Sequence, residues 1–454
     1  SNKILDNINN FSNDRFSNFK IKIMDGVRNL LQNKNFLIYG FGKSGQACFK
    51  FLNKKNLCKI FDDNQKNIPK KYKKNIINSK QLEKYFFEFI VLSPGIDIKK
   101  CKISRYLTKN KSKIISELDI FHLYYPKIKK ITITGTNGKS TTSKLLFDVL
   151  KRNKNDVRLT GNIGFPILLE KNFNDNTIFI IEASSYQLEY SQFFQSNYSV
   201  ILNLYPNHLE RHGNFKNYIK SKFKLLKSQN KRGYAFIEDK NKILNKLIKK
   251  NSIKSKIKFI NYKKYSSYLK YIKNNYFKNL SNIKNLSFVF EISKTLKINF
   301  KTVIQATNKF KGLDYRQQII FNSKKLMIIN DSKSTSLSST KLLLESYKNI
   351  YWIVGGLSKR GDRLNLEKKY FNEIKAYIYG KDKNFFSKIL FRKIKIKVRK
   401  NLNQLLKLVF ADSYKDYKKK VILFSPSAAS FDQFKNFETR GLYFNKIIKK
   451  YITK

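Results

Sequence analysis

Cysteine, glycine, proline and tryptophan are scarce in this chain of 454 residues, which contains 3 Cys, 17 Gly, 6 Pro and 1 Trp. The cysteines, Cys48, Cys58 and Cys101, form no Cys-x-x-Cys pair and cannot all pair with one another, which argues against a disulfide-stapled secreted domain. No apolar run approaches the roughly 18 residues of a membrane span. The first ten residues lack the apolar core of a signal peptide. We therefore expect a cytoplasmic protein without a membrane partner.

Acidic residues are also few, with 31 Asp and Glu against 94 Lys and Arg and a net charge of +63. Such a balance can indicate nucleic-acid binding. Here the excess is mostly lysine, which lacks the bidentate geometry of arginine, and it is spread along the whole chain. Asn, Ile, Tyr and Phe are also over-represented although they carry no charge. We interpret the charge as a compositional bias and expect no nucleic-acid partner, although anionic substrates would be attracted.

The chain is too long for one ordinary core, and 41% of its residues are hydrophobic, so two or three globular domains are expected. Strand-like runs alternate with helical stretches, which predicts an α/β fold with parallel, doubly wound sheets. The predicted strands are 36–39, 58–61, 89–92, 130–134, 177–181, 199–204, 325–329, 350–354, 376–379 and 420–424, and the predicted helices include 46–54 and 140–151. Residues 251–278 could form short strands or a long surface excursion.

Glycines cluster despite their scarcity, which suggests positive φ angles or backbone brought close to a ligand. The clusters are Gly40, Gly42 and Gly45; Gly135 and Gly138; Gly161 and Gly164; and Gly355 and Gly356. Three of these clusters directly follow strand-like runs.

The most informative cluster lies in the segment Thr134–Thr141, with the sequence TGTNGKST between a predicted strand and a predicted helix. In this arrangement backbone N–H groups and the helix N-terminus face phosphate groups. Lys139 would neutralise the β- and γ-phosphates of ATP, and Ser140 would offer a hydroxyl to Mg²⁺. The segment departs from the full P-loop pattern because Ile133 stands where that pattern has its first glycine.

Thr134–Thr141 resembles the ATP loop of the Mur ligase family and of the related folylpolyglutamate synthases. Further segments resemble this family in the same order along the chain: Asn162–Gly164 (NIG), Glu182–Leu188 (EASSYQL), Asn203–Gly213 (NLYPNHLERHG), Asn330–Thr335 (NDSKST) and Ser425–Gly441. The last two are similar to segments of one member of the family. The resemblance runs from about residue 34 to the end, and residues 1–33 match nothing recognisable.

The resemblance implies three domains: a Rossmann-like UDP-binding domain over residues 1–125, with residues 1–33 as an unplaced extension; a central P-loop-type ATP-binding domain with a parallel sheet over 126–313; and a Rossmann-like amino-acid-binding domain over 314–454. The first domain opens with Gly40-x-Gly42-x-x-Gly45 after a strand, followed by Asp62 and Asp63. Alone, that pattern would indicate NAD, since an acidic residue there can bind a ribose. A separate ATP loop makes a dehydrogenase a weaker alternative. The uridine nucleotide site implied by the resemblance consists of Lys43, Ser44, Asp62, Asp63, Ser93, Gly95 and Asn162.

Two Mg²⁺ ions are implied by the resemblance, with Ser140, Glu182, His208 and Lys222 as ligands. Glu182 ends an apolar strand, where a lone carboxylate could bind a hard cation. Lys222 would be carbamylated, which turns a cation into an anionic oxygen ligand; Lys220 and Lys224 are rivals by a shift in register. In the family's segment around His208, Asp stands where this chain has Asn207 and Glu210. We expect His122 and His212 to be structural or solvated.

Remaining contacts are also implied by the resemblance. ATP would be bound by Gly135, Thr136, Asn137, Gly138, Lys139, Ser140, Thr141, Asn282, Asn285, Arg316, Asp331 and Lys333; D-glutamate by Thr335, Lys359, Ser430, Phe431 and Phe437; and the reaction would depend on Lys139, Glu182, His208 and Lys222. Ser281 replaces the histidine that precedes the two asparagines in the family.

The implied enzyme is an ATP-dependent ligase, expected to be monomeric, that activates the carboxylate of UDP-N-acetylmuramoyl-L-alanine as an acyl phosphate and joins it to D-glutamate during peptidoglycan precursor synthesis. Three alternatives stay open: a different Mur-type or folate ligase, a non-catalytic nucleic-acid binder, and an NAD-dependent oxidoreductase.

Overall fold

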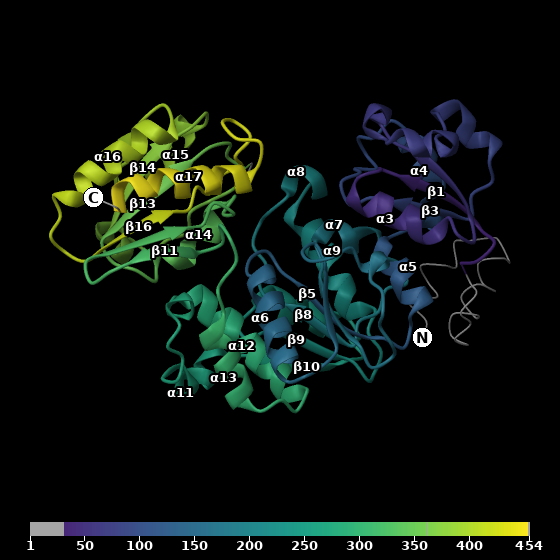
Figure 1. Ribbon diagram of the computed structural model, residues 1–454, viewed down its shortest axis with the longest axis horizontal. Coiled ribbons are helices and arrows are strands. Elements are labelled where there is room, and N and C mark those ends of the chain that lie inside the picture. The colour runs from purple at the N-terminus through teal and green to yellow at the C-terminus, as the bar shows by residue number, and fades with distance from the viewer. Residues whose placement is uncertain (1–30, 360, 453–454) are drawn as a thin grey trace.

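The computed structural model describes residues 31–359 and 361–452 of the chain. The expectation of no signal peptide and nearly all of the extension predicted over residues 1–33 fall outside the described part, so both stay predictions. Three sheets, one each in an N-terminal, a central and a C-terminal unit, are arranged around the middle of the molecule (Figure 1). The predicted α/β class is confirmed, whereas the domain boundaries near residues 125 and 313 stay predictions. No helix in the described part of the chain is long and apolar enough to cross a membrane.

The N-terminal unit has a parallel sheet in the order β2-β1-β3-β4. Its elements are β1 (Asn35–Tyr39), α3 (Lys43–Leu52), β2 (Leu57–Phe61), β3 (Phe89–Leu92), α4 (Ser104–Lys109), β4 (Ile114–Ile115) and α5 (Glu117–Tyr124). The glycine turn after β1 starts α3 three residues earlier than the predicted helix. A Cβ atom at Gly45 would lie 1.9 Å from the carbonyl oxygen of Gly40, so the tight packing of this turn requires glycine.

The central unit has a parallel sheet in the order β10-β9-β8-β5-β7-β6. Its elements are β5 (Lys129–Thr134), α6 (Lys139–Arg152), β6 (Val157–Gly161), the 3₁₀ turn η5 (Ile167–Leu169), β7 (Ile178–Glu182), α7 (Ser185–Tyr190), β8 (Tyr198–Ile201), α8 (Leu209–His212), α9 (Phe215–Lys227), β9 (Tyr234–Glu238), α10 (Lys242–Lys250), β10 (Lys256–Ile260), α11 (Ser266–Leu269), α12 (Leu280–Thr295) and α13 (Phe300–Lys309). Helices α12 and α13 pack against α6 (Figure 1).

The C-terminal unit has the strand order β11-β12-β16-β13-β14-β15. Its elements are β11 (Gln318–Asn322), β12 (Leu326–Asn330), α14 (Leu337–Leu344), β13 (Ile350–Gly355), β14 (Ile374–Tyr379), α15 (Lys383–Leu390), β15 (Lys395–Val398), α16 (Leu402–Tyr414), β16 (Lys420–Phe424) and α17 (Phe437–Ile452). The predicted parallel arrangement is confirmed for strands β12 to β16, whereas β11, which was not predicted as a strand, pairs antiparallel with β12. The two strands are joined by a turn in which Ser323 N donates to Leu326 O, too short for a parallel crossover.

The bounds predicted for the buried apolar strands lie within a few residues of the observed bounds, as in β1, β3, β5, β13 and β16. The predicted strand 199–204 is too long, because β8 ends at Ile201. Residues 251–278 contain both β10 and short helical turns. Both outer strands β10 and β15 alternate lysine with apolar residues and are only partly buried, which explains their weak sequence signal.

Candidate active site

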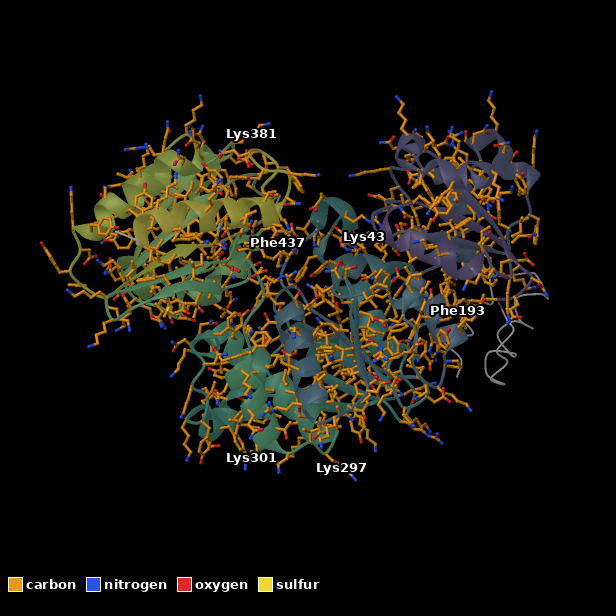
Figure 2. The ribbon with its side chains drawn as sticks, viewed as in Figure 1. Lys43, Phe193, Lys297, Lys301, Lys381 and Phe437 are labelled. Atoms are coloured by element: carbon orange, nitrogen blue, oxygen red, sulfur yellow. The ribbon has the colours of Figure 1, made fainter. Side chains whose placement is uncertain are left out.

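A cleft of about 770 Å³ lies where the three units meet, with side chains from each on its walls. Lys43, on the N-terminal unit, and Phe437, on the C-terminal unit, lie on the sides of these units that face the centre of the molecule (Figure 2). Residues named from the sequence that line the cleft are Lys43, Ser44, Thr136–Thr141, Asn162, Glu182, His208, Lys222, Asn285, Arg316, Asp331, Lys333 and Thr335. Segments far apart in the sequence therefore contribute to one site.

The loop between β5 and α6 is the floor of this cleft. Gly135 has φ +152° and Gly138 has φ +83°, conformations that favour glycine. A Cβ atom at Gly138 would lie 2.2 Å from Asn285 Oδ1 on α12, so the loop and that helix are in close contact. Lys139 Nζ donates to the carbonyl oxygens of Gly135 (2.9 Å) and Thr136 (3.0 Å). Burial lowers the pKa of Lys139, the nearby Glu182 opposing this effect.

Glu182 ends β7 beside this loop and is almost fully buried. Its Oε1 accepts a hydrogen bond from Asn162 Nδ2 at 2.8 Å, whereas its Oε2 has no hydrogen-bond partner. A buried carboxylate oxygen without a partner costs free energy unless a cation or donor reaches it. The free oxygen of Glu182 therefore fits a ligand of a hard divalent cation.

Of the three candidate lysines on α9, only Lys222 has an amino group that reaches the loop between β5 and α6, which is called the phosphate loop below. Its Nζ donates to Thr134 Oγ1 and Gly135 O, both at 3.0 Å. Lys220 is exposed, and Lys224 Nζ instead donates to carbonyl oxygens at the end of α7. Burial, followed by the charge of Lys139, lowers the pKa of Lys222 well below its usual value. The geometry thus distinguishes Lys222 from Lys220 and Lys224, which sequence spacing alone does not.

His208 precedes α8 in a left-handed conformation with φ +55°. Its Nδ1 lies 2.7 Å from the hydroxyl of Tyr186 and 3.7 Å from Glu210 Oε1. Burial, followed by the charges of Lys359, Lys139 and Lys222, lowers the pKa of His208 to about 3. The imidazole is therefore neutral at physiological pH, the form that can bind a metal. His122 and His212 do not line the cleft.

Side chains of the C-terminal unit close the opposite wall. The guanidinium of Arg316 donates to the hydroxyl of Ser140, and Lys333 Nζ lies 3.9 Å from the ring centre of Phe437. Asp331 accepts a hydrogen bond from Ser425 Oγ at 2.9 Å. Burial raises the pKa of Asp331 to about 7. Phe437 thus contacts a residue predicted for ATP, although it was itself predicted for D-glutamate.

Several residues predicted to bind ligands do not line the cleft. Asn282 is fully buried behind Asn285 and donates to Tyr276 O at 2.8 Å. Gly135 is the first residue of the loop between β5 and α6, and its carbonyl oxygen accepts hydrogen bonds from Lys139 and Lys222. These two residues therefore support the loop between β5 and α6 and its neighbour α12 from within.

Several of the residues predicted to bind the uridine nucleotide also do not line the cleft. Asp62 accepts hydrogen bonds from the backbone N–H groups of Phe41 and Asn64, and Asp63 accepts one from the Tyr39 hydroxyl at 2.7 Å. Ser93 Oγ donates to Gly40 O at 2.6 Å. In this structure Asp62, Asp63 and Ser93 bond within the N-terminal unit, and Gly95 lies beyond the cleft lining.

Among the residues predicted for D-glutamate, only Thr335 lines the cleft. Lys359 Nζ donates to Asn207 Oδ1 at 2.8 Å, which joins the C-terminal unit to the segment around His208. Ser430 is buried, whereas the neighbouring Phe431 is 70% exposed.

Tyr186, Tyr218 and Glu117 are among the cleft residues that were not predicted as site residues. Tyr186, the partner of His208, lies in the segment Glu182–Leu188 that carried the resemblance, so it could have been found there. Tyr218 bonds to Thr136 Oγ1 at 2.9 Å. Glu117 is buried in the cleft wall and accepts a hydrogen bond from Ser44 Oγ, and nothing in the sequence distinguishes it.

No group of three or more His, Cys, Asp or Glu residues that could hold a metal occurs among residues 31–359 and 361–452. Glu182 and His208 both line the cleft, but neither belongs to such a group. Any cation held here must also use hydroxyl oxygens, phosphate oxygens or a modified side chain.

Comparison with known proteins gives one family. The Mur ligase middle domain matches residues 133–309. The chain is 32% identical to the UDP-N-acetylmuramoylalanine–D-glutamate ligase of Rickettsia prowazekii (strain Madrid E), over 93% of this chain and 99% of that protein. It is 33% identical to the ligase of the same name from Buchnera aphidicola subsp. Schizaphis graminum, over 92% and 98%.

Solved structures show the same fold. The MurF ligase of Thermotoga maritima in complex with ADP has a TM-score of 0.54 and 14% identity, and the match covers 94% of this chain and 97% of that chain. The UDP-N-acetylmuramate-alanine ligase MurC of the same organism has a TM-score of 0.52 and 16% identity, covering 93% and 100%. The chain belongs to the Mur ligase family.

Proposed function

We propose that this chain is the ATP-dependent ligase that adds D-glutamate to UDP-N-acetylmuramoyl-L-alanine. One observation carries the proposal: a single cleft combines the phosphate loop, the glycine turn of the N-terminal unit and the Asn330–Thr335 segment of the C-terminal unit. The substrates are inferred from relatives that carry this name and are 32–33% identical over more than nine-tenths of the chain. Because the reaction consumes ATP and a UDP-linked precursor, we assign it to the cytoplasm.

The proposed reaction has two steps. An oxygen of the L-alanyl carboxylate attacks the γ-phosphorus of ATP, the bond to the β-phosphate oxygen breaks, and ADP leaves. The amine nitrogen of D-glutamate, having lost one proton, then attacks the acyl carbon. The tetrahedral intermediate loses a second proton from nitrogen and expels phosphate, which leaves the amide. Phosphate departs with one oxygen that came from the carboxylate.

The side chains of the cleft suit the charges of these steps. Transfer of a phosphoryl group between anions depends on cations and alignment. Lys139 and Arg316 provide cationic groups at the phosphate loop. Lys333 adds a third at the opposite wall. Approach of the C-terminal unit would exclude water, which would otherwise hydrolyse the acyl phosphate.

Magnesium fits the residues present, since Glu182 Oε2 has no partner and His208 is neutral. We assign Glu182, His208 and the hydroxyl of Ser140 to hold it, together with Lys222 as a carbamate. Bound Mg²⁺ would neutralise charge on the phosphate oxygens. Lys222 supports this assignment because only a neutral amine reacts with CO₂, and burial lowers the pKa of its amino group well below the usual value, which favours the neutral form.

Phosphate release tests the proposal. With ATP, Mg²⁺ and UDP-N-acetylmuramoyl-L-alanine, we expect rapid release only when D-glutamate is added. L-Glutamate, L-alanine, L-lysine and meso-diaminopimelate serve as matched alternatives. Turnover with one of these and not with D-glutamate would exclude the proposed substrate. Turnover with a folate substrate would assign the chain to the other branch of related ligases.

A further inference from the structure

The side chain of Arg211, on helix α8, is enclosed although it carries a permanent charge. Only 9% of this side chain is exposed. Its Nη2 lies 3.2 Å from Glu189 Oε2 and also donates to the Tyr190 hydroxyl, both on α7. A guanidinium does not lose its proton in a protein, so its burial requires such partners. Arg211 has no part in the reaction steps proposed above.

The same guanidinium also reaches the N-terminal unit. Its Nη1 lies 3.6 Å from Asp97 Oδ1. Tyr190, which it contacts, donates to the backbone oxygen of Ile96 at 2.6 Å. Ile96 and Asp97 lie in the segment 93–97, which follows β3 and whose Pro94 lines the cleft. Arg211 and Tyr190 therefore hold the cleft side of the N-terminal unit against α7 and α8 of the central unit.

Both helices begin beside the side chains assigned to the cation. Helix α7 follows Glu182 closely, and α8 begins directly after His208. Helix α8 lies between the N-terminal and C-terminal units (Figure 1). A second contact between the N-terminal and central units lies near β4, where Gln192 Nε2 donates to Ser112 O at 3.1 Å. Loss of the Arg211 contacts should therefore loosen the segment 93–97 without separating the two units.

We propose that Arg211 is a positioning residue that fixes the segment 93–97 of the N-terminal unit relative to the phosphate loop. The proposal rests on the proposed function in one respect, that the UDP-linked substrate spans the N-terminal and central units. The carboxylate at one end of such a substrate reaches the γ-phosphate only if the unit that holds the other end is correctly placed. A small displacement of reacting groups can cost a large factor in rate.

Hydrogen exchange of the ligand-free full chain tests the structural part of this inference. Within the segment 93–97, Ile96 N donates to Ser93 O at 3.0 Å, so its exchange reports how firmly the segment is held. In Arg211→Met, which keeps a long side chain without charge, we expect amides of this segment to exchange at least about tenfold faster. Amides of β1 and β5 should exchange as in the wild type.

Binding and turnover test the positioning role. UMP and Mg²⁺–ATP, each added alone, should bind to Arg211→Met with Kd within about twofold of the wild type, because each contacts one unit. With UDP-N-acetylmuramoyl-L-alanine and D-glutamate, kcat should fall at least about tenfold. Arg211→Lys keeps the charge beside the two carboxylates, and its kcat should be at least about threefold above that of Arg211→Met.

Two further variants serve as comparisons. Asp97→Asn should lower kcat in the wild type but not in Arg211→Met, because the contact between the two side chains is already lost there. Arg232→Met, an exposed change in the central unit, should keep the exchange and kcat of the wild type.

Unchanged exchange or unchanged kcat in Arg211→Met would overturn the inference. A rise in either Kd that matches the fall in kcat would also overturn it, since the change would then have damaged one nucleotide site. The exchange measurement needs no substrate. A wild type that uses another amino acid would therefore contradict the proposed function and leave the exchange result standing.

Discussion

Lys139 and Lys222 place two amino groups on the same carbonyl oxygen, that of Gly135, at 2.9 and 3.0 Å. Two neighbouring ammonium ions repel each other, and burial opposes the charge on both. Of the two, the pKa of Lys222 is lowered well below its usual value. The lowering is the larger at Lys222, which favours the neutral amine that carbamylation needs, whereas the nearby Glu182 opposes the loss of charge at Lys139.

The first prediction concerns Lys222. Lys222→Arg should lower kcat by about 10²- to 10³-fold, because arginine cannot form the anionic carbamate that stabilises the cation site. In ¹³C-bicarbonate, the wild type should show a protein carbamate signal in the ¹³C NMR spectrum that the variant lacks. Lys220→Arg, an exposed change on the same helix, is the matched control. Full activity of Lys222→Arg would exclude the assigned role.

At the scale of elements, the loop between α5 and β5 is held by a buried lysine. Lys130 Nζ donates to the carbonyl oxygens of Tyr125 (3.0 Å), Pro126 (3.4 Å) and Ile128 (2.8 Å). Burial nevertheless lowers the pKa of Lys130 to about 7. The unfolded chain, with an ordinary lysine, binds a proton at higher pH than the folded chain does.

The second prediction follows from this difference. Between about pH 7 and 10 the unfolded state binds one more proton at Lys130, so this group raises the free energy of unfolding by about 1.4 kcal/mol per pH unit. Below pH 7 both states are protonated and this contribution to the slope disappears. In Lys130→Met, the free energy of unfolding should rise with pH less steeply than in the wild type, by that amount per pH unit. Denaturant titrations at several pH values measure this slope. Parallel curves for the two proteins would contradict the assigned ionisation.

Elements differed in how well the sequence predicted them, for physical reasons. β1 and β5 were predicted because they are largely apolar and buried, and the glycine turns after them locate two of the loops that line the cleft. β15 was missed because its alternating lysines face solvent at the sheet edge. The pairing of β11 was missed because strand direction depends on the turn at Ser323.

Some of the site residues could likewise be predicted from the sequence, and others could not. The phosphate loop and Glu182 could be placed from the sequence, because strand ends on one sheet edge meet. The contact between Lys359 and Asn207 could not, because it depends on how two units are oriented. Asn282 matched its motif, yet the structure buries it behind Asn285.

At the scale of the whole molecule, the proposed function requires two separate nucleotide sites, one in the central unit and one in the N-terminal unit. A ligand at 100 times its Kd should raise the free energy of unfolding by about 2.7 kcal/mol. We expect both Mg²⁺–ATP and UMP to raise Tm in the wild type. Lys139→Met should lose the ATP effect and keep the UMP effect, because Lys139 lies at the central loop alone.

Lys144→Met serves as the control, since Lys144 lies on the same helix α6 and pairs with Asp148. It should retain both effects. A rise in Tm with NAD and none with UMP would contradict the assignment of the glycine turn Gly40–Gly45 and favour an oxidoreductase.

Transfer of ¹⁸O from the carboxylate to the released phosphate shows whether ATP activates the carboxylate as an acyl phosphate. UDP-N-acetylmuramoyl-L-alanine carrying ¹⁸O in both carboxylate oxygens is converted with ATP and D-glutamate, and the released phosphate is analysed by ³¹P NMR. An acyl phosphate intermediate requires one ¹⁸O atom in each released phosphate, together with ADP as the other product. Unlabelled phosphate, or ¹⁸O in AMP with release of pyrophosphate, would contradict it.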